Sequence, residues 1–269
     1  GEARLGDKRL TPRLVKIAGN KSLKPGASYL EAANGDRYDV KAYCNFIRNE
    51  RKQINFDAIL SPHAERTRRR MKGEDCVLVI QDTTDLNYSS LKCCEGLGSI
   101  GKNEKGVETM GLKLHSSFAV DGQGLPPGIL GAKCYAPDPS KVKKKKSEKR
   151  NTPISQKESF RWLESYEACV EASKLMPGTR IVNVSDREAD MYELFELADE
   201  NNNCVDLIVR AKHDRLLVDG EKKLFGKLRD EPVRFELEVD IPPQRARNKK
   251  QGKEKRPYMP ARKARLEVR

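Results

Sequence analysis

The chain has 269 residues, a formal net charge of +13, 37% hydrophobic residues and 35% charged residues. That length suffices for one large domain or two small ones with a buried core, and the composition is not that of a disordered chain. No apolar run reaches the roughly 18 residues of a membrane span and no signal-peptide-like segment lies near the N-terminus, so we expect neither a membrane protein nor a secreted precursor.

The seven cysteines also bear on the class of protein. Their number is odd and no two form a C-x-x-C pair. This usage is typical of reduced thiols and argues against a zinc ribbon. We therefore expect a cytoplasmic protein.

The positive charge is concentrated in three segments. Residues 1–70 carry 16 basic and 8 acidic side chains, residues 141–150 carry 7 and 1, and residues 244–269 carry 11 and 2. The remainder carries 19 basic and 29 acidic side chains and is therefore acidic. Basic segments favour a polyanion such as DNA, RNA or an anionic membrane surface, although a lysine run alone is equally consistent with a solvated loop. Three basic segments around one acidic centre favour the polyanion.

The first 70 residues are expected to be mainly helical. Leu10, Leu14 and Ile17 form an apolar stripe at helical spacing, which predicts a helix over 7–18. A turn is expected at 24–28. Further helices are expected over 38–49 and 56–71, the latter with Pro62 near a boundary or kink.

The pattern changes after Gly73 to alternating strand and helix signals. Asp121-Gly122-Gln123-Gly124 is a hairpin signal between two apolar runs. The expected order is a strand at 76–81, a hairpin of 111–120 with 125–136, a helix at 158–176, a strand at 180–185, a helix at 188–200 and a strand at 204–212. This order predicts a mixed α/β layer.

The character shifts again after residue 216. Alternating residues predict half-exposed strands over 234–241 and 262–269. The last strand has no partner after it, which suggests that the sequence ends inside a domain. The absence of an initiating Met at Gly1 similarly suggests a fragment or an engineered chain.

Two aspartates occupy the same local position. Asp82 directly follows the run CVLVIQ, and Asp186 directly follows RIVNVS. Side chains at the carboxyl ends of strands in α/β folds point into the crevice where ligands bind. Two carboxylates there suit Mg²⁺, which prefers oxygen ligands and supports phosphoryl transfer. Each acid alone has a simpler explanation, since Asp186 could cap the following helix and Asp82 could form an Asx-turn.

Two further motifs carry weaker signals. The G-x-G-x-x-G spacing at 96–101 has no apolar strand before it and no helix after it, so we expect a mobile loop near the active site rather than a dinucleotide site. His115 lies in an expected strand, where a satisfied structural histidine is favoured over a ligand.

Several segments together resemble one known family, the DDE transposases of the insertion-sequence-four group (transposon-five-like). DTT at 82–84 followed about a hundred residues later by DREAD at 186–190 is the most specific part of the resemblance. The N-terminal segments LGDKRLTPRLVKIA and FIRNE are similar to that group's DNA-binding domain. The other similar segments are VIQDTTDLNY at 79–88, GLGSIG at 96–101, GLKLHSSFAV at 111–120, VSDREADMYE at 184–193, LIVRAKHDR at 207–215 and PARKARLEVR at 260–269.

The resemblance implies a domain organisation. It implies an α/β fold with a ribonuclease-H-like catalytic core, a mixed sheet with flanking helices, over residues 71–215. A small helical DNA-binding domain over 1–70 would precede that core. The incomplete start of a β-rich insertion, over 216–269, would follow it.

The resemblance also implies cut-and-paste DNA transposition. In that reaction a metal-activated water nicks the transposon end, the freed 3′-hydroxyl forms a hairpin on the other strand, and the reopened 3′ end joins target DNA. Asp82 and Asp186 match the first two acids of the catalytic triad that binds Mg²⁺, with Mn²⁺ as a substitute. The positions implied to contact DNA are Arg9, Arg13, Asn45, Arg48, Arg210 and Lys212, with Asn45 at a position where the family has Arg.

One departure from the family limits the expected activity. The third acid of the family is a Glu on a helix after the insertion, and no such helix precedes Arg269. Glu188 is not a substitute on sequence grounds. We therefore expect the 269-residue polypeptide alone not to cleave DNA, although the family is one of enzymes.

The expected partners are double-stranded DNA at transposon ends and targets, and a second copy in the complete protein. No membrane partner is expected, and the implied location is the bacterial cytoplasm in association with the nucleoid. Two alternatives stay open. One is a non-catalytic DNA-binding derivative that occupies transposon ends or inhibits the full enzyme, and the other is a ribonuclease-H-like nuclease acting on structured DNA.

Overall fold

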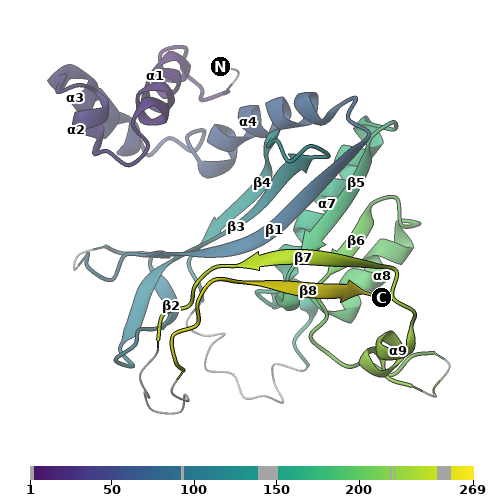
Figure 1. The fold of residues 1–269 in the computed structure, drawn as a ribbon. Coiled ribbons are helices and arrows are strands. Elements are labelled where there is room, and N and C mark those ends of the chain that lie inside the picture. The colour runs from purple at the N-terminus through teal and green to yellow at the C-terminus, as the bar shows by residue number, and fades with distance from the viewer. Residues whose placement is uncertain (1–2, 92–93, 139–150, 219, 221, 247–255) are drawn as a thin grey trace. The chain divides into compact units, whose positions relative to one another are not determined.

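The structure is a computed structural model that describes residues 3–91, 94–138, 151–218, 220, 222–246 and 256–269. The chain divides into two compact units, Gly1–Lys212 and His213–Arg269. Figure 1 shows the elements of both units. The basic segment 141–150 lies outside the described residues, as do Cys93 and part of the basic segment 244–269.

The first unit begins with helices, as predicted: α1 (Leu10–Leu23), α2 (Tyr29–Ala32), α3 (Arg37–Ile47) and α4 (Phe56–Met71). Leu10, Leu14 and Ile17 of the predicted stripe pack against a small cluster that includes buried Leu5 and Phe46. The short helix α2 was not predicted. Its N-cap Ser28 accepts a hydrogen bond from the Glu31 backbone, and it lies in the stretch expected to follow a turn.

The helix α4 has the predicted bounds, but its proline lies at a different place in the helix than predicted. Asn55 caps it by accepting a hydrogen bond from the Ala58 backbone at 2.8 Å. Pro62 lies inside the helix, not at a boundary. Further along, His63 Nε2 accepts the Ile129 backbone N–H at 3.0 Å, which joins α4 to the sheet.

The helices are followed by a mixed sheet of six strands among the described residues (Figure 1). Its central strand β1 (Cys76–Asn87) pairs antiparallel with β3 (Glu108–Asp121) and parallel with β5 (Arg180–Ser185). β5 pairs parallel with β6 (Asp206–Val209). The same edge of β3 carries β2 (Gly98–Lys102) and β4 (Gly128–Tyr135), both antiparallel. The predicted mixed α/β layer is confirmed.

The predicted hairpin is also confirmed. β3 ends at Asp121 and β4 runs back beside it. Asp121 Oδ1 accepts the backbone N–H groups of Gln123 and Leu125 at 2.9 and 2.8 Å. The aspartate side chain therefore closes the turn itself, as Asx-turns do.

The first predicted strand is longer than expected, and this changes the place of Asp82. The apolar run ends at Gln81, but β1 continues to Asn87 because its antiparallel pairing with β3 continues to Asn87 and Gly111. The prediction that Asp82 ends a strand is therefore wrong. What ends just before Asp82 is the parallel pairing with β5, whose last pair is Ile80 and Val184.

The core of the sheet is covered by α7 (Phe160–Leu175), close to the predicted helix over 158–176. Trp162, Tyr166 and Cys169 of this helix are fully buried against Val77 and Val79 of β1. Burying such side chains contributes roughly 1.5–3 kcal/mol each, so this layer stabilises the sheet on which the acids lie. The preceding 3₁₀ turn, η1 (Ile154–Gln156), packs its Ile154 on the same core.

The helix predicted over 188–200 is interrupted. A 3₁₀ turn, η2 (Arg187–Ala189), comes first, and α8 (Tyr192–Glu200) follows after Asp190 and Met191. Asp190 is 7% exposed and accepts the backbone N–H of Lys212 at 2.6 Å. This hydrogen bond between distant segments fixes Asp190 between the two helical turns. It could not be predicted from the apolar spacing of the helix.

The glycine-rich segment 96–101 is not a loop throughout, contrary to the prediction, because β2 occupies Gly98–Lys102. A Cβ at Gly98 would lie 2.2 Å from the Pro137 carbonyl oxygen. This glycine therefore serves a close backbone approach.

The second unit contains α9 (Leu224–Asp230) and a hairpin of β7 (Phe235–Ile241) with β8 (Arg262–Val268). The last predicted strand corresponds to β8, which pairs antiparallel with β7, the strand before it. Among all described residues, no helix is both long and apolar enough to cross a bilayer.

Gly111→Ala is predicted to lower the free energy of unfolding by at least about 1–3 kcal/mol, the usual cost of overpacking. The added Cβ would lie 2.1 Å from the Leu86 carbonyl oxygen, which β-sheet pairing holds in place. Urea unfolding measures the change. Gly131→Ala in β4 is the matched control, because its Cβ would meet no atom within 4 Å. Equal effects of the two substitutions would contradict the close approach.

Candidate active site and nucleic-acid interface

The two predicted acids lie at the same level of the sheet. Ile80 and Val184 are the last residues paired between β1 and β5. Asp82 and Asp186 each follow two residues later on these neighbouring parallel segments, and both are exposed. Parallel pairing thus brings together two carboxylates that are 104 positions apart in the sequence.

Each carboxylate is oriented by a local backbone hydrogen bond. Asp82 Oδ1 accepts the Thr83 N–H at 2.7 Å, and Asp186 Oδ1 accepts the Glu188 N–H at 2.8 Å as the N-cap of η2. The simpler explanations from sequence, a local turn and a cap, are thus both present in the structure. In the described part of the chain no hydrogen bond to the Oδ2 atom of either acid is present, and both residues are exposed.

The donor set suits a hard divalent cation. Mg²⁺ is commonly held by one or two protein carboxylates while it keeps several waters. Within the described residues, no group of three or more His, Cys, Asp or Glu side chains is placed to hold a metal ion. Asp82 and Asp186 are two oxygen donors of the type that such an ion uses.

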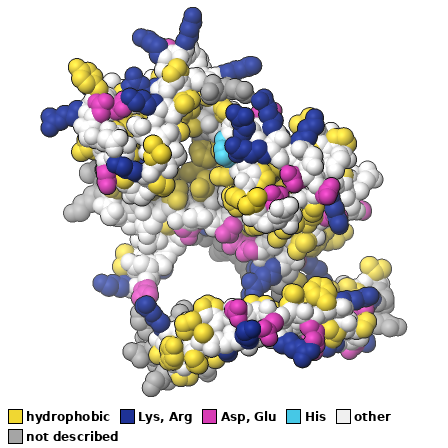
Figure 2. All heavy atoms as spheres, turned by 45° about the horizontal axis from the view of Figure 1, so that its top comes forward, with side chains coloured by type: hydrophobic (Ala, Val, Ile, Leu, Met, Phe, Trp, Pro, Cys, Tyr) yellow, Lys and Arg dark blue, Asp and Glu magenta, His cyan; other side chains and the backbone are white. Residues whose placement is uncertain are grey.

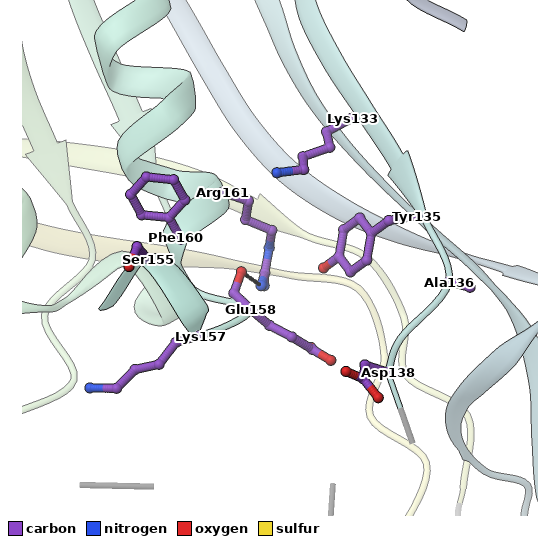
Figure 3. A pocket seen from close by; sticks show the side chains of 9 residues that line it. All are labelled: Lys133, Tyr135, Ala136, Asp138, Ser155, Lys157, Glu158, Phe160 and Arg161. Atoms are coloured by element: carbon purple, nitrogen blue, oxygen red, sulfur yellow. Dashed lines mark hydrogen bonds between the residues drawn. The ribbon is translucent and has the colours of Figure 1, made fainter. Parts of the chain in front are cut away.

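An arginine that sequence reasoning missed lies beside both acids. The Arg161 side chain on α7 is 6% exposed. Its Nε donates to Thr83 Oγ1 at 3.0 Å, and one terminal nitrogen donates to the Glu188 carboxylate. The other terminal nitrogen donates to the Glu158 carbonyl at 2.7 Å, drawn as a dashed line in Figure 3. A single guanidinium thus joins the residue after Asp82 to the η2 turn capped by Asp186.

The surroundings of Arg161 form a pocket of about 180 Å³ between α7 and the end of β4. Figure 3 shows Arg161 reaching from α7 toward Tyr135 of β4. Lys133 of β4 forms an ion pair with Glu164 of α7, with Nζ 2.5 Å from Oε2, and fastens the helix to the sheet. The lining therefore carries both signs of charge.

The histidine of the sheet is buried, but only one of its ring nitrogens has a hydrogen-bond partner among the described residues. His115 is 1% exposed, packs its ring edge-to-face on Trp162, and has Nδ1 2.9 Å from Thr83 Oγ1. Burial, with the nearby charges of Arg161 and Lys133, lowers the pKa of His115 to about 4. The imidazole is therefore neutral at physiological pH. Its Nε2 has no hydrogen-bond partner among the described groups.

The segment VRAK runs beside the Asp186 turn. The Arg210 backbone N–H donates to the Ser185 carbonyl at 3.1 Å, directly before Asp186. The Lys212 backbone N–H is held by Asp190, so both residues are tied through the main chain. The side chains of Arg210 and Lys212 are exposed.

The four N-terminal residues implied to contact DNA are all exposed, but they differ in whether they form an ion pair. Arg9 precedes α1 and forms an ion pair with Asp7 at 3.0 Å, and this hydrogen-bonded guanidinium holds the pKa of Asp7 well below its usual range. Arg13 on α1 and Arg48 at the end of α3 have no ion-pair partner among the described residues. Asn45 is exposed on α3. Of the three arginines, Arg13 and Arg48 are therefore the two whose charge no described acidic side chain compensates.

On one face of the molecule the charged side chains are dispersed. On the face drawn in Figure 2, Lys and Arg side chains project in separate groups with acidic and hydrophobic side chains between them. A further basic group lies at the end of α4, where Arg68 and Arg69 share Glu65 and Arg70 donates to the Pro127 carbonyl.

Comparison with known families adds a specific finding for the N-terminal helices. Residues 1–52 match the family model described as transposase DNA-binding. The match supports a transposase that binds DNA. It spans α1, α2 and α3 and ends before α4 begins at Phe56. Arg9, Arg13, Asn45 and Arg48 all fall inside this transposase DNA-binding segment.

The sequence singles out Asp82 and Asp186 but not Arg161, which bonds to residues near them. Arg161 stands in the segment FRWL, where its neighbours Trp162 and Leu163 are buried as well. A charged residue between apolar positions of a buried helix face was the available signal, since such residues are rarely buried without a partner. The contact of Arg161 with Thr83 and Glu188 depends on the tertiary fold and had no local signal.

Stability should depend on pH through His115. Its folded pKa lies below the ordinary value, so its contribution is complete above pH 6.5 and is lost as the pH falls toward 4, because the unfolded chain takes up the proton first. The full loss is about 3 kcal/mol. Urea unfolding between pH 7 and pH 4.5 is predicted to show a smaller loss in His115→Gln than in the parent chain. Parallel pH profiles of the two proteins would contradict a buried neutral imidazole.

Proposed function

We propose that the chain is a DDE transposase of the insertion-sequence-four group that binds transposon-end DNA. The observation that carries the proposal is the placement of Asp82 and Asp186 at one level of neighbouring parallel strands. The transposase DNA-binding match over residues 1–52 supplies the second support. The mixed sheet with α7 against it is compatible with the ribonuclease-H-like core that this family implies.

In this proposal Asp82 and Asp186 hold Mg²⁺, or Mn²⁺ in its place, through their Oδ2 atoms. The ion, when bound, would supply charge stabilisation and an activated water for phosphoryl transfer. Their Oδ1 atoms stay on the backbone N–H groups of Thr83 and Glu188, which fixes the orientation of both carboxylates. Arg210 and Lys212 hold the DNA backbone next to the acids. Arg9, Arg13, Asn45 and Arg48 contact the transposon end.

Catalysis belongs to the complete enzyme in this proposal. The family's triad has three acids, and the 269 residues contain two of them, Asp82 and Asp186. The third acid would complete the site, and the active transposase would be a dimer. Metal charge and positioning supply most of the rate in this class of reaction, so a polypeptide of these residues is proposed to bind DNA without cutting it.

One observation favours a second candidate function. The described residues contain no group of three metal-binding side chains, which suits a non-catalytic DNA-binding derivative that occupies transposon ends. The two candidates differ in what a supplied third acid would do. Joining a helix that carries the family's Tyr, Arg and Glu to the C-terminus would restore cleavage only in a transposase segment.

Binding to duplex DNA is predicted to weaken steeply with salt, because Lys and Arg release counterions from the phosphates. Fluorescence anisotropy with labelled duplex DNA should give a linear fall of log K with log salt. Arg13→Ala and Arg48→Ala should each reduce the slope by about one. Lys174→Ala, which removes an exposed ion pair with Glu171 on α7, is the control and should leave the slope unchanged. An affinity independent of salt would exclude the basic segments as the DNA-binding surface.

Asp82→Asn is predicted to leave DNA affinity intact or to raise it slightly, because it removes a negative charge beside the phosphates. A gel-shift titration compares it with the parent chain. Neither protein should nick a duplex with the transposon ends in Mg²⁺ or Mn²⁺. A large loss of affinity in Asp82→Asn would count against a metal-ligand role. A metal-dependent nick by the parent chain would show that two acids suffice.

A further inference from the structure

We propose that Arg161 is a positioning residue that sets the spacing between the chain segments carrying Asp82 and Asp186. The inference rests on the proposed metal site, since its consequence is the geometry of two metal ligands. Arg161 does not reach the acids themselves. It acts through Thr83 on one side and Glu188 on the other.

The need for such a link follows from where the sheet pairing stops. Backbone pairing between β1 and β5 ends at Ile80 and Val184. Asp82 and Asp186 lie beyond that point, so no hydrogen bond of the parallel ladder fixes their separation. Beyond this point β1 pairs only with β3, while the segment after β5 turns into η2. Arg161 spans the two segments just where the ladder no longer joins them.

The chemistry of the link suits arginine and no other residue. The guanidinium is planar and offers donors in a fixed fork, so its contacts with Thr83, Glu188 and the Glu158 carbonyl hold one another in place. The Glu158 carbonyl, which lies just before the N-cap of α7, anchors the fork to the chain three residues before Arg161. A lysine carries the same charge at one nitrogen and cannot span both partners. Because Arg161 is 6% exposed, water does not replace a lost contact freely.

The Thr83 hydroxyl is held from a second direction. It receives Arg161 Nε and also contacts His115 Nδ1 at 2.9 Å. His115 in turn packs on Trp162, the residue after Arg161. The position of Thr83, and with it that of Asp82, is therefore determined from α7 and β3 together.

Charge and geometry make opposite predictions for this residue. As a cation near the acids, Arg161 disfavours a bound divalent ion by repulsion, and its removal alone would tighten binding. As a positioning residue it favours the ion, and its removal weakens binding. Outer-shell partners of metal ligands typically change metal affinity by about 10–100-fold.

The test uses the 269-residue chain with Arg161→Lys, which keeps the charge and loses the fork. Arg180→Lys is the matched control, because Arg180 lies on β5 in an exposed ion pair with Asp206, at the opposite end from Asp186. Hydrogen–deuterium exchange follows residues 82–88 and 186–191, and electron paramagnetic resonance follows Mn²⁺ binding. Arg161→Lys should speed exchange in both segments and weaken Mn²⁺ binding about tenfold. Arg180→Lys should change neither.

The two readouts separate this inference from the proposed function. Unchanged exchange in both segments, or tighter Mn²⁺ binding in Arg161→Lys or Arg161→Ala, would overturn the positioning role. If Asp82→Asn and Asp186→Asn leave Mn²⁺ binding unaltered, the proposed metal site fails while the exchange result still decides the link. Should the Arg161 variants not fold, Glu188→Ala removes the same link from its exposed end. It must then speed exchange at 82–88, on the opposite side of Arg161, for the inference to stand.

Discussion

The structure of the candidate site depends on the parallel pairing of β1 with β5. The register that opposes Ile80 to Val184 brings Asp82 and Asp186, 104 positions apart, to the same level. A shift by one residue would turn one of the two carboxylates toward the opposite face, because side chains alternate along a strand. The burial of Val77, Val79 and Ile181 under α7 fixes this register. Core packing therefore determines the geometry of a site that is itself exposed.

Two kinds of charge serve different ends in this molecule. The acidic centre gathers carboxylates that, without a cation, repel the phosphates of DNA. The basic segments around it attract those phosphates and account for the net charge of +13. Arg161 is a basic residue that lies among the acidic side chains of this centre. Its charge is compensated by Glu188, and its donors hold the turn that carries Asp186.

The sequence predicted most of the elements, because apolar spacing in 10–17, 160–175 and 180–185 reflects burial directly. Both acids were singled out for the same reason, since each follows a buried apolar run; their metal role stays a prediction. The extension of β1 past Asp82 could not be predicted, because it depends on antiparallel pairing with β3 and not on local apolarity. The break between η2 and α8 depends on the bond from Lys212 to Asp190. The contacts of Arg161 could not be predicted from local sequence, because its three partners come from three separate parts of the chain.

The most direct test of the paired acids is anomalous diffraction from crystals of the chain soaked in Mn²⁺. The account predicts an anomalous peak within coordination distance of one oxygen each of Asp82 and Asp186, and no peak there in Asp186→Asn crystals. The predicted ligands are the Oδ2 atoms, with Oδ1 of each acid still on its backbone N–H. Manganese bound only elsewhere, or carboxylates too far apart to share one ion, would contradict the account.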